Sequence, residues 1–195
     1  MKKLIATTAV CALLSGVAFA QEGPWMVRAR AVGIDMANKD GTDLALTVNN
    51  KTIPEVDITY FFNKNLAAEL VLTVPQKQTV SSNGVNIGTF KHLPPTLTLQ
   101  YHFDGSPDYK PYVGAGINYT DISKVDLSAA NARLDSHSWG TAMQVGVDFP
   151  IDKNLSFNID IKKVNIKTNV YVGAADHGVL KLNPTLMGVG LGYRF

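Results

Sequence analysis

The residues of this chain best suited to do chemistry are charged side chains set singly into apolar, alternating segments. Alternation at a period of two puts successive side chains on opposite faces of a strand, so these charges share the face opposite the apolar residues. In a narrow interior they should pair, because one isolated buried charge costs several kcal/mol. The charge plug predicted in this way contains Arg28, Glu69, His102, Asp148, Asp160, Lys162 and Arg194, with Arg30 and Asp57 close by.

Enzymatic chemistry is the alternative use of such residues. Hydrolysis needs a nucleophile beside a base that a carboxylate orients. His137 lies near Asp135 and Ser136, and His177 follows Asp176. Neighbours of this kind on polar connecting segments are ordinarily solvated surface residues, and no spacing of His, Cys or carboxylates indicates a metal site. We therefore expect no enzyme, no metal and no cofactor.

Eight segments with strand periodicity must position the charges. In residues 55–62, for example, apolar and aromatic residues alternate with Glu55, Asp57 and Thr59. The predicted strands are residues 25–35, 55–62, 66–74, 90–103, 112–122, 138–151, 155–172 and 180–195.

The connections between these strands alternate in length. Residues 63–65, 104–109 and 152–154 form short polar turns, whereas residues 36–54, 76–89 and 123–137 form long connections, and 173–179 a shorter one. Outer-membrane barrels have short periplasmic turns and longer extracellular loops. An even number of strands then places both termini in the periplasm.

No stretch after the N-terminal segment approaches the roughly 18–20 consecutive apolar residues of a spanning helix. Transmembrane barrel strands need only about 9–11 alternating residues, which keeps the overall hydropathy low, and the mean hydropathy is +0.04. A soluble, ligand-binding barrel is the alternative, with its apolar residues facing inward. Aromatic residues near the short turns favour a lipid-facing girdle instead. We predict an all-β fold: an eight-stranded antiparallel transmembrane β-barrel.

The N-terminal segment has the form of a secretory signal. Lys2 and Lys3 precede a short apolar run, and Ala18-Phe19-Ala20 forms a small-x-small cleavage site. We expect residues 1–20 to be removed and residues 21–195 to form one barrel domain; a membrane anchor is the alternative. Removing two of the 18 basic residues leaves 16, equal to the 16 acidic ones, so no basic field for nucleic acid remains.

Several longer motifs carry a family resemblance. They are His92-Leu-Pro-Pro-Thr-Leu, Pro111-Tyr-Val-Gly-Ala-Gly-Ile-Asn-Tyr-Thr, Ser138-Trp-Gly, Gln144-Val-Gly-Val-Asp and the final Gly-Tyr-Arg-Phe. Together they resemble the OmpW family over the whole chain after the signal segment. The resemblance implies a small eight-stranded barrel associated with uptake of small hydrophobic molecules, similar to the alkane-import barrels, and use as a receptor by bacteriocins.

The inward positions near the long connections suggest the path of a solute. They are largely apolar and form a predicted funnel of Val32, Ile34, Val71, Thr73 and Leu186. Pro94 and Pro95 lie inside the fourth predicted strand, where proline cannot donate to the ladder. We expect either a lateral gap beside them that releases solute into the lipid, or a strand that ends early with both prolines in a loop.

Two further features concern the last strands. At Lys162-Lys163 the apolar phase of the seventh strand slips by one, so a cationic lumen residue or an outward bulge is predicted. Gly188, Gly190 and Gly192 face inward and leave lumen space beside the arginines of the first strand, the expected barrel-closing partner. The terminal Tyr193 and Phe195 resemble the signal read by the barrel-assembly machinery.

The predicted function is passive uptake of small hydrophobic or amphipathic molecules through the outer membrane. The alternative is a structural, adhesive or receptor barrel that acts through its extracellular loops. Expected partners are outer-membrane lipid, hydrophobic solutes and the assembly machinery; the sequence does not indicate an oligomeric state.

Overall fold

The computed structural model describes residues 23–104, 106–127 and 131–195. The predicted signal segment of residues 1–20 lies outside these ranges. Among the described residues there is no helix long and apolar enough to cross a membrane. Every regular element of the described chain is a β-strand.

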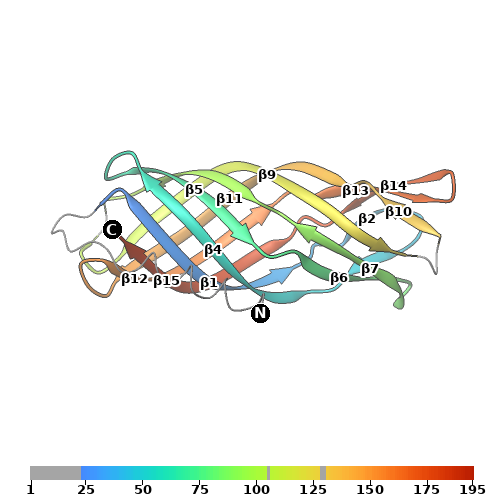
Figure 1. The fold of residues 1–195 in the computed structure, drawn as a ribbon, viewed down its shortest axis with the longest axis horizontal. Coiled ribbons are helices and arrows are strands. Elements are labelled where there is room, and N and C mark those ends of the chain that lie inside the picture. The colour runs from blue at the N-terminus through green and yellow to red at the C-terminus, as the bar shows by residue number, and fades with distance from the viewer. Residues whose placement is uncertain (1–22, 105, 128–130) are drawn as a thin grey trace, which may run out of the picture.

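Eight antiparallel strands form a closed barrel (Figure 1). They hydrogen-bond in the order β11-β12-β15-β1-β4-β5-β8-β9, and β9 also pairs with β11, which closes the ring. The predicted fold class is therefore confirmed. The eight strands are β1 (Trp25–Asp35), β4 (Lys51–Phe61), β5 (Leu66–Thr73), β8 (Thr96–His102), β9 (Lys110–Asp126), β11 (His137–Pro150), β12 (Leu155–Val164) and β15 (Thr185–Arg194).

The first and last strands meet as predicted. The register of β1 with β15 runs from Met26↔Arg194 to Asp35↔Thr185. The ladder reaches the terminal residue, because the amide of Phe195 donates to the carbonyl of Trp25 at 2.8 Å and the amide of Trp25 donates back at 3.2 Å. The hydrophobic C-terminal strand thus has no free edge that could pair with another chain.

Short polar turns join strands at the end where the chain terminates, which we call the short-turn end (Figure 1). Each of two turns is held by one side chain that accepts two backbone hydrogen bonds. The acceptors are Asn63, from the amides of residues 65 and 66, and Asp152, from those of residues 154 and 155. These amides also hold the pKa of the exposed Asp152 carboxyl below its usual value.

At the opposite end most residues of the long connections form further strands. Two lines of pairing extend the wall: β9-β7-β6-β3, and a separate sheet of order β10-β13-β14-β2. We call these seven strands the hairpin extension. They are β2 (Lys39–Thr42), β3 (Leu46–Val48), β6 (Gln76–Ser82), β7 (Val85–Leu93), β10 (Ala132–Leu134), β13 (Lys167–Val172) and β14 (Ala175–Lys181).

The hairpin extension corrects three predicted strands and all four predicted long connections, which contain β2, β3, β6, β10 and parts of β7 and β14. The fourth, seventh and eighth predicted strands are each divided, at Pro94-Pro95, at residues 165–166 and at residues 182–184. Within the predicted loop 76–89, Asn83-Gly84 joins β6 to β7 with φ values of 49° and 79°. Asn-Gly flanked by alternating residues is a hairpin signal, and the sequence interpretation missed it.

The two faces of the wall exchange polarity between the barrel and the hairpin extension. Even-numbered residues from 156 to 170 are all buried, so the predicted phase slip is wrong. Lys162 and Val164 both point inward, whereas Ile161 and Lys163 both point outward. Beyond this point the outward residues are polar and the inward residues are apolar, the reverse of the barrel. The alternation of inward and outward side chains itself continues without a break. The apolar outer band, which lipid requires, therefore belongs to the barrel alone.

The inward side chains of the hairpin extension pack into a hydrophobic core. It occupies the place of the predicted open funnel, and its members come from the barrel rim and from both lines of extension strands. The buried residues are Val32, Ile34, Met36, Leu46, Val48, Ile53, Val80, Phe90, Ile122, Leu127, Ala142, Val164, Ile166, Val170, Leu180 and Leu182.

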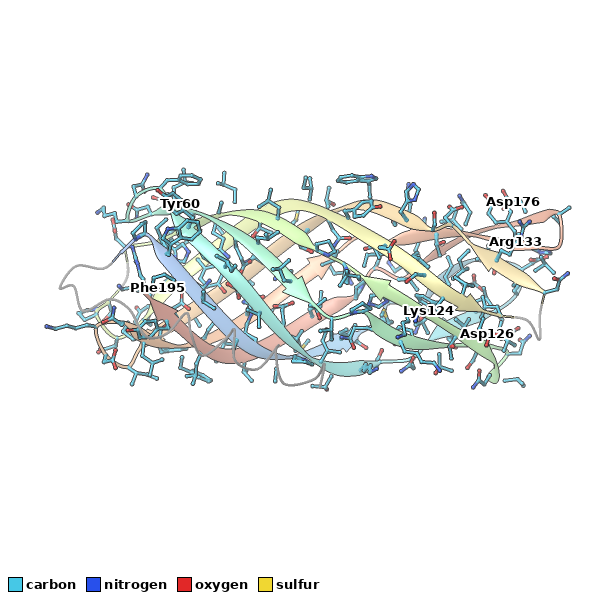
Figure 2. The ribbon with its side chains drawn as sticks, viewed as in Figure 1. Tyr60, Lys124, Asp126, Arg133, Asp176 and Phe195 are labelled. Atoms are coloured by element: carbon cyan, nitrogen blue, oxygen red, sulfur yellow. The ribbon has the colours of Figure 1, made fainter. Side chains whose placement is uncertain are left out.

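Aromatic side chains encircle the outer surface at the short-turn end. Edge contacts join Trp25 to Tyr60 at 4.8 Å between ring centroids, and Tyr101 to Phe103 at 5.1 Å. Figure 2 shows Tyr60 and Phe195 at this end, and Arg133 and Asp176 at the other. Such a girdle suits the interface between lipid and water. Trp139, 62% exposed and packed on Tyr119, marks the other border of the apolar band.

Candidate functional site: a charged lumen below an interrupted wall

Eight charged side chains fill the middle of the lumen, and we call them the charged cluster. They come from β1, β4, β5, β11 and β12, and each is at most 6% exposed. Alternation explains the convergence, since inward positions of neighbouring strands share a level. The members are Arg28, Arg30 and Lys162, with Glu55, Asp57, Glu69, Asp148 and Asp160.

Arg28 binds the carboxylates nearest the short-turn end. Its guanidinium donates two hydrogen bonds to Asp148, at 2.9 Å and 3.3 Å, a bidentate geometry that fixes both groups. The remaining nitrogen lies 3.4 Å from Asp57 and donates to the hydroxyl of Thr59 at 2.9 Å. One arginine thereby ties three strands, β1, β4 and β11, across the lumen.

Arg30 lies one level further from the short-turn end and contacts more carboxylates. One guanidinium nitrogen is 2.7 Å from Asp57 and 3.0 Å from both Glu55 and Glu69. The other nitrogen is 3.7 Å from Asp160. Burial makes each unpaired charge expensive, so the four carboxylates around Arg30 depend on this cation.

The sequence interpretation missed a set of neutral residues that complete the cluster. Asn158 donates to Asp148 at 2.8 Å, the hydroxyl of Tyr112 donates to Asp160 at 2.9 Å, and Gln144 donates to Glu69 at 2.9 Å. All three lie at inward positions of their strands, and this position in the alternation was the sequence signal that could have identified them. These hydrogen bonds and the ion pairs together hold the side chains in place across the lumen.

Two residues of the predicted plug lie apart from the charged cluster, nearer the short-turn end. His102 packs between the rings of Phe61 and Tyr112 at 4.9 Å from each and hydrogen-bonds Gln100. Arg194 lies over the ring of Phe61 at 3.9 Å and donates to the carbonyl of Gly23. Both line a cavity of about 280 Å³ that opens at this end.

The glycines of β15 make room for the arginine stems. A Cβ on Gly192 would lie 3.1 Å from Cγ of Arg28, and one on Gly188 would lie 3.4 Å from Cδ of Arg30. At Gly190 it would meet the carbonyl of Ala29 and the Cα of Arg30, which are backbone atoms and cannot rotate away.

Gly190→Ala is therefore expected to destabilise the barrel by about 1–3 kcal/mol through overpacking. Gly188→Ala is the matched control, because its methyl group meets only movable side-chain atoms, and it should cost less than about 1 kcal/mol. Urea unfolding of both variants in lipid vesicles measures the difference. Equal destabilisation would contradict the packing assigned to Gly190.

The predicted funnel residues lie immediately on the hairpin side of the charged cluster. Val32, Ile34 and Val71 are buried, whereas Thr73 and Leu186 are half-buried. A cavity of about 20 Å³ lies among them, no larger than a single water needs. Its lining includes Ile34, Val71, Thr73, Leu186, Pro94, Val164, Pro184, Glu55, His92 and Lys162.

The barrel wall is interrupted beside this cavity. The register of β5 with β8 ends at Val71↔Thr96, and pairing resumes between β6 and β7 only at Gln76↔His92. Residues 72–75 and 93–95, all within the described chain, therefore face each other without ladder pairing. Proline at 75, 94 and 95 explains the interruption, because none of the three can donate a backbone hydrogen bond.

On their other side, Pro94 and Pro95 remain hydrogen-bonded to β9. Asn118 donates to the carbonyls of Pro94 and Pro95 at 3.2 Å and 3.1 Å, and the amide of Tyr119 donates to Pro95 at 3.1 Å. Leu93 pairs with Asp121 in the register that β8 and β9 already share. The interruption is therefore confined to the seam with residues 72–75.

The carboxylates beside His137 and His177 in the sequence bond other residues: Asp135 accepts from the side chain of Asn169, and Asp176 accepts from the amide of Gly178. No group of three or more His, Cys, Asp or Glu residues in the described ranges is placed to hold a metal ion. His137 hydrogen-bonds Ser136, whereas His177 bonds Asp43 of another hairpin at 2.9 Å.

Comparison with known proteins agrees with this architecture. The model of the OmpW family matches residues 21–195. The outer-membrane protein y4mB of Sinorhizobium fredii is 40% identical over 186 residues, covering 88% of this chain and 80% of that protein. Outer membrane protein W of Escherichia coli is 35% identical over 215 residues and covers both chains fully.

A solved structure supports the same assignment. The crystal structure of the outer membrane protein OprG from Pseudomonas aeruginosa superposes with a TM-score of 0.75 at 26% identity. The match covers 90% of this chain and 98% of OprG. The apolar band, the aromatic girdle and the closed ladder are what such a protein requires in lipid. The chain belongs to the OmpW family and forms an outer-membrane β-barrel whose short turns and termini face the periplasm.

Proposed function

We propose that this barrel is a passive route by which small hydrophobic or amphipathic molecules cross the outer-leaflet barrier and leave sideways into the membrane. The observation that carries the proposal is the position of the unpaired seam. It lies beside the apolar cavity and on the extracellular side of the charged cluster, where the axial path ends. The route requires no catalytic step, metal or cofactor.

The charged cluster makes an axial path unfavourable for an apolar solute. Moving such a solute through it would separate ion pairs such as Arg28–Asp148 and Arg30–Asp57 without offering them new partners. A solute held on the extracellular side of the cluster has a lower barrier in the lateral direction, where no ladder hydrogen bond has to break.

Apolar surfaces line both ends of the proposed route. A cavity of about 150 Å³ lies inside the hairpin extension, lined mainly by aliphatic side chains such as Leu44, Val80 and Leu180. The smaller cavity beside Pro94 is closed to solutes in this structure. Passage therefore requires side chains such as Leu186 and Val164 to rotate and the seam to widen.

Two buried polar atoms at the smaller cavity account for the amphipathic part of the proposal. Among the described residues neither Nζ of Lys162 nor Nδ1 of His92 has a hydrogen-bond partner. The Lys162 ammonium has only ion-pair contacts, at 3.7–4.0 Å from Glu69, Glu55 and Asp160. Unsatisfied buried groups of this kind favour a solute that brings one polar atom on an apolar body.

The name of one relative is consistent with this solute class. A Pseudomonas aeruginosa protein that is 25% identical over 93% of this chain is called dibenzothiophene metabolism operon protein PahQ. Dibenzothiophene is an apolar aromatic molecule, so it is a reasonable probe for uptake.

Restoring the ladder at the seam tests the proposal. Pro94→Thr with Pro95→Val supplies two backbone donors. The donor at residue 94 faces the seam, because the carbonyl of residue 95 already faces β9, and closing the seam by this hydrogen bond should slow dibenzothiophene uptake by about tenfold. Uptake is measured in cells that lack the natural protein and express the variant. Pro111→Val is the matched control, because Pro111 lies near the short-turn end of β9, where the register with β11 is intact.

The folded state of each variant is established by its heat-dependent mobility in gel electrophoresis. Normal uptake by a folded Pro94→Thr, Pro95→Val barrel would contradict the lateral route. Uptake that falls equally in Pro111→Val would show that any proline replacement in the wall has this effect.

A further inference from the structure

Gln78 is a buried carboxamide without a partner inside the hairpin extension. It lies on β6, which pairs with β7 (Figure 1). Its side chain is fully buried, and neither Nε2 nor Oε1 has a hydrogen-bond partner among the described residues. Other buried glutamines keep at least one such bond, since Gln100 bonds His102 and Gln144 donates to Glu69.

The surroundings of Gln78 are apolar. Val80 is the next inward residue of β6 away from the barrel, and Phe90 lies directly opposite on β7; both belong to the hydrophobic core. An amide that moves from water into such surroundings without new hydrogen bonds lowers the stability of the fold. Native proteins leave few buried groups in this state, so each one needs a specific explanation. The stability of the hairpin extension does not explain a glutamine at position 78.

Gln78 lies between two cavities. Val80 lines the cavity of about 150 Å³ inside the hairpin extension. His92, the next inward residue after Phe90 towards the barrel, lines the smaller cavity beside the seam. Inward positions of one strand are about 7 Å apart, so Gln78 is one such step from the lining of each cavity. Gln78 and Phe90 thus form part of the partition that a solute must pass.

The side chain of Gln78 restricts the polar group that it can bind. It presents a donor and an acceptor side by side, at Nε2 and Oε1. A carboxamide on the ligand presents the same two groups in reverse order and satisfies both atoms with two parallel hydrogen bonds. An ionised carboxylate cannot donate to Oε1, and it would carry a charge into the apolar core. A neutral carboxamide is therefore the matching group.

The larger cavity restricts the size of the apolar part of the ligand. Its lining is mainly aliphatic and includes Leu44, Leu134 and Leu180. An apolar cavity of about 150 Å³ accommodates a benzene-sized molecule. A ring that lies beside Val80 places its substituent one inward position away, at Gln78.

We propose that Gln78 is a binding residue of the solute route and selects molecules that carry a neutral carboxamide on a benzene-sized apolar body. The inference rests on the proposed uptake function, for which it names the polar group of the solute. The apolar body occupies the larger cavity, and the carboxamide pairs with Gln78. Binding satisfies both atoms of a buried amide that the described residues leave unpaired.

Benzamide is the probe, titrated into the isotope-labelled mature barrel in lipid nanodiscs and followed by NMR. The side-chain amide signals of Gln78 are identified by their loss in Gln78→Met, and benzamide should shift them. Methionine keeps the length of the side chain without its hydrogen-bonding atoms. Gln78→Met should therefore weaken benzamide binding about tenfold, as read from the backbone amide signals of cavity residues such as Val80. Toluene, which makes no hydrogen bond, should bind both proteins equally.

The same variant should have the opposite effect on the thermal midpoint Tm. Removing an unpaired buried amide should raise Tm without ligand by about 2–6 °C. Gln76→Met is the matched control, because Gln76 lies on the same face of β6 but donates to the carbonyl of Val74 at 2.7 Å. This control should lower Tm and leave benzamide binding unchanged.

Equal benzamide affinity of the wild type and Gln78→Met would overturn the proposal. A lower Tm for Gln78→Met would also overturn it, because Gln78 would then stabilise the fold through a bound water or another partner. Methyl benzoate offers only an acceptor and should bind the wild type more weakly than benzamide; equal binding would have the same consequence. These equilibrium measurements need no passage through the wall, so this site and the lateral route can fail separately.

Discussion

Arg30→Gln is expected to destabilise the barrel by about 3–5 kcal/mol, the range found when one partner of a buried ion pair is removed. Arg30 is the cation nearest to Glu55, Asp57 and Glu69, at 2.7–3.0 Å. Its loss leaves the five carboxylates of the charged cluster with two cations, Arg28 and Lys162. Water cannot compensate, because Asp57 and Glu69 are fully buried.

Glu55→Gln is the matched control for that prediction. It changes the charge of the same cluster by one, with little change of size, but it removes one of five carboxylates rather than one of three cations. Repulsion among the remaining carboxylates falls, so the expected cost is about 1 kcal/mol or less. Urea unfolding in lipid vesicles measures both variants. A cost for Arg30→Gln no larger than that for Glu55→Gln would contradict the electrostatic account of the lumen.

Much of the fold could be predicted from alternation, because lipid outside and charge inside impose opposite chemistry on successive residues. β1, β5 and the pairing of β1 with β15 follow directly from that pattern. The hairpin extension could not be found in this way. Beyond the membrane the outer face is polar and the inner face apolar, so the change at Lys162 was interpreted as a slip of phase rather than as the end of the lipid-facing wall.

The site was predictable in its residue types but not in its contacts. Because Arg28, Glu69, Asp148 and Asp160 all lie at inward positions of their strands, strand alternation predicted that they share the lumen. It could not show that Arg194 lies at the periplasmic mouth. The level of a side chain in the lumen depends on strand register, which sequence periodicity does not fix. The neutral partners, such as Tyr112 and Asn158, carry no charge signal and were missed for that reason.

A reversible lock on the unpaired seam should abolish most uptake. Continuing the register of β5 and β8 past Val71↔Thr96 places Val74 opposite Leu93, and both side chains point outward. Val74→Cys with Leu93→Cys would form a disulfide across the seam, since directly opposed residues approach the Cβ separation of about 3.8 Å that the bond needs. The only native cysteine, Cys11, lies in the predicted signal segment, so no other thiol interferes.

Leu70→Cys with Leu97→Cys is the matched control. These residues also point outward and pair directly, but they lie in the intact ladder between β5 and β8. A disulfide there adds the same bond without crossing the seam. Uptake through the control barrel should be the same in its oxidised and reduced states.

The most direct test of the lateral route is therefore dibenzothiophene influx through the Val74→Cys, Leu93→Cys barrel before and after reduction. Influx should be at least about tenfold slower in the oxidised state, since widening the seam would require breaking a covalent bond, and it should recover fully on reduction. Unchanged influx in a barrel whose disulfide has demonstrably formed would contradict passage beside Pro94 and Pro95.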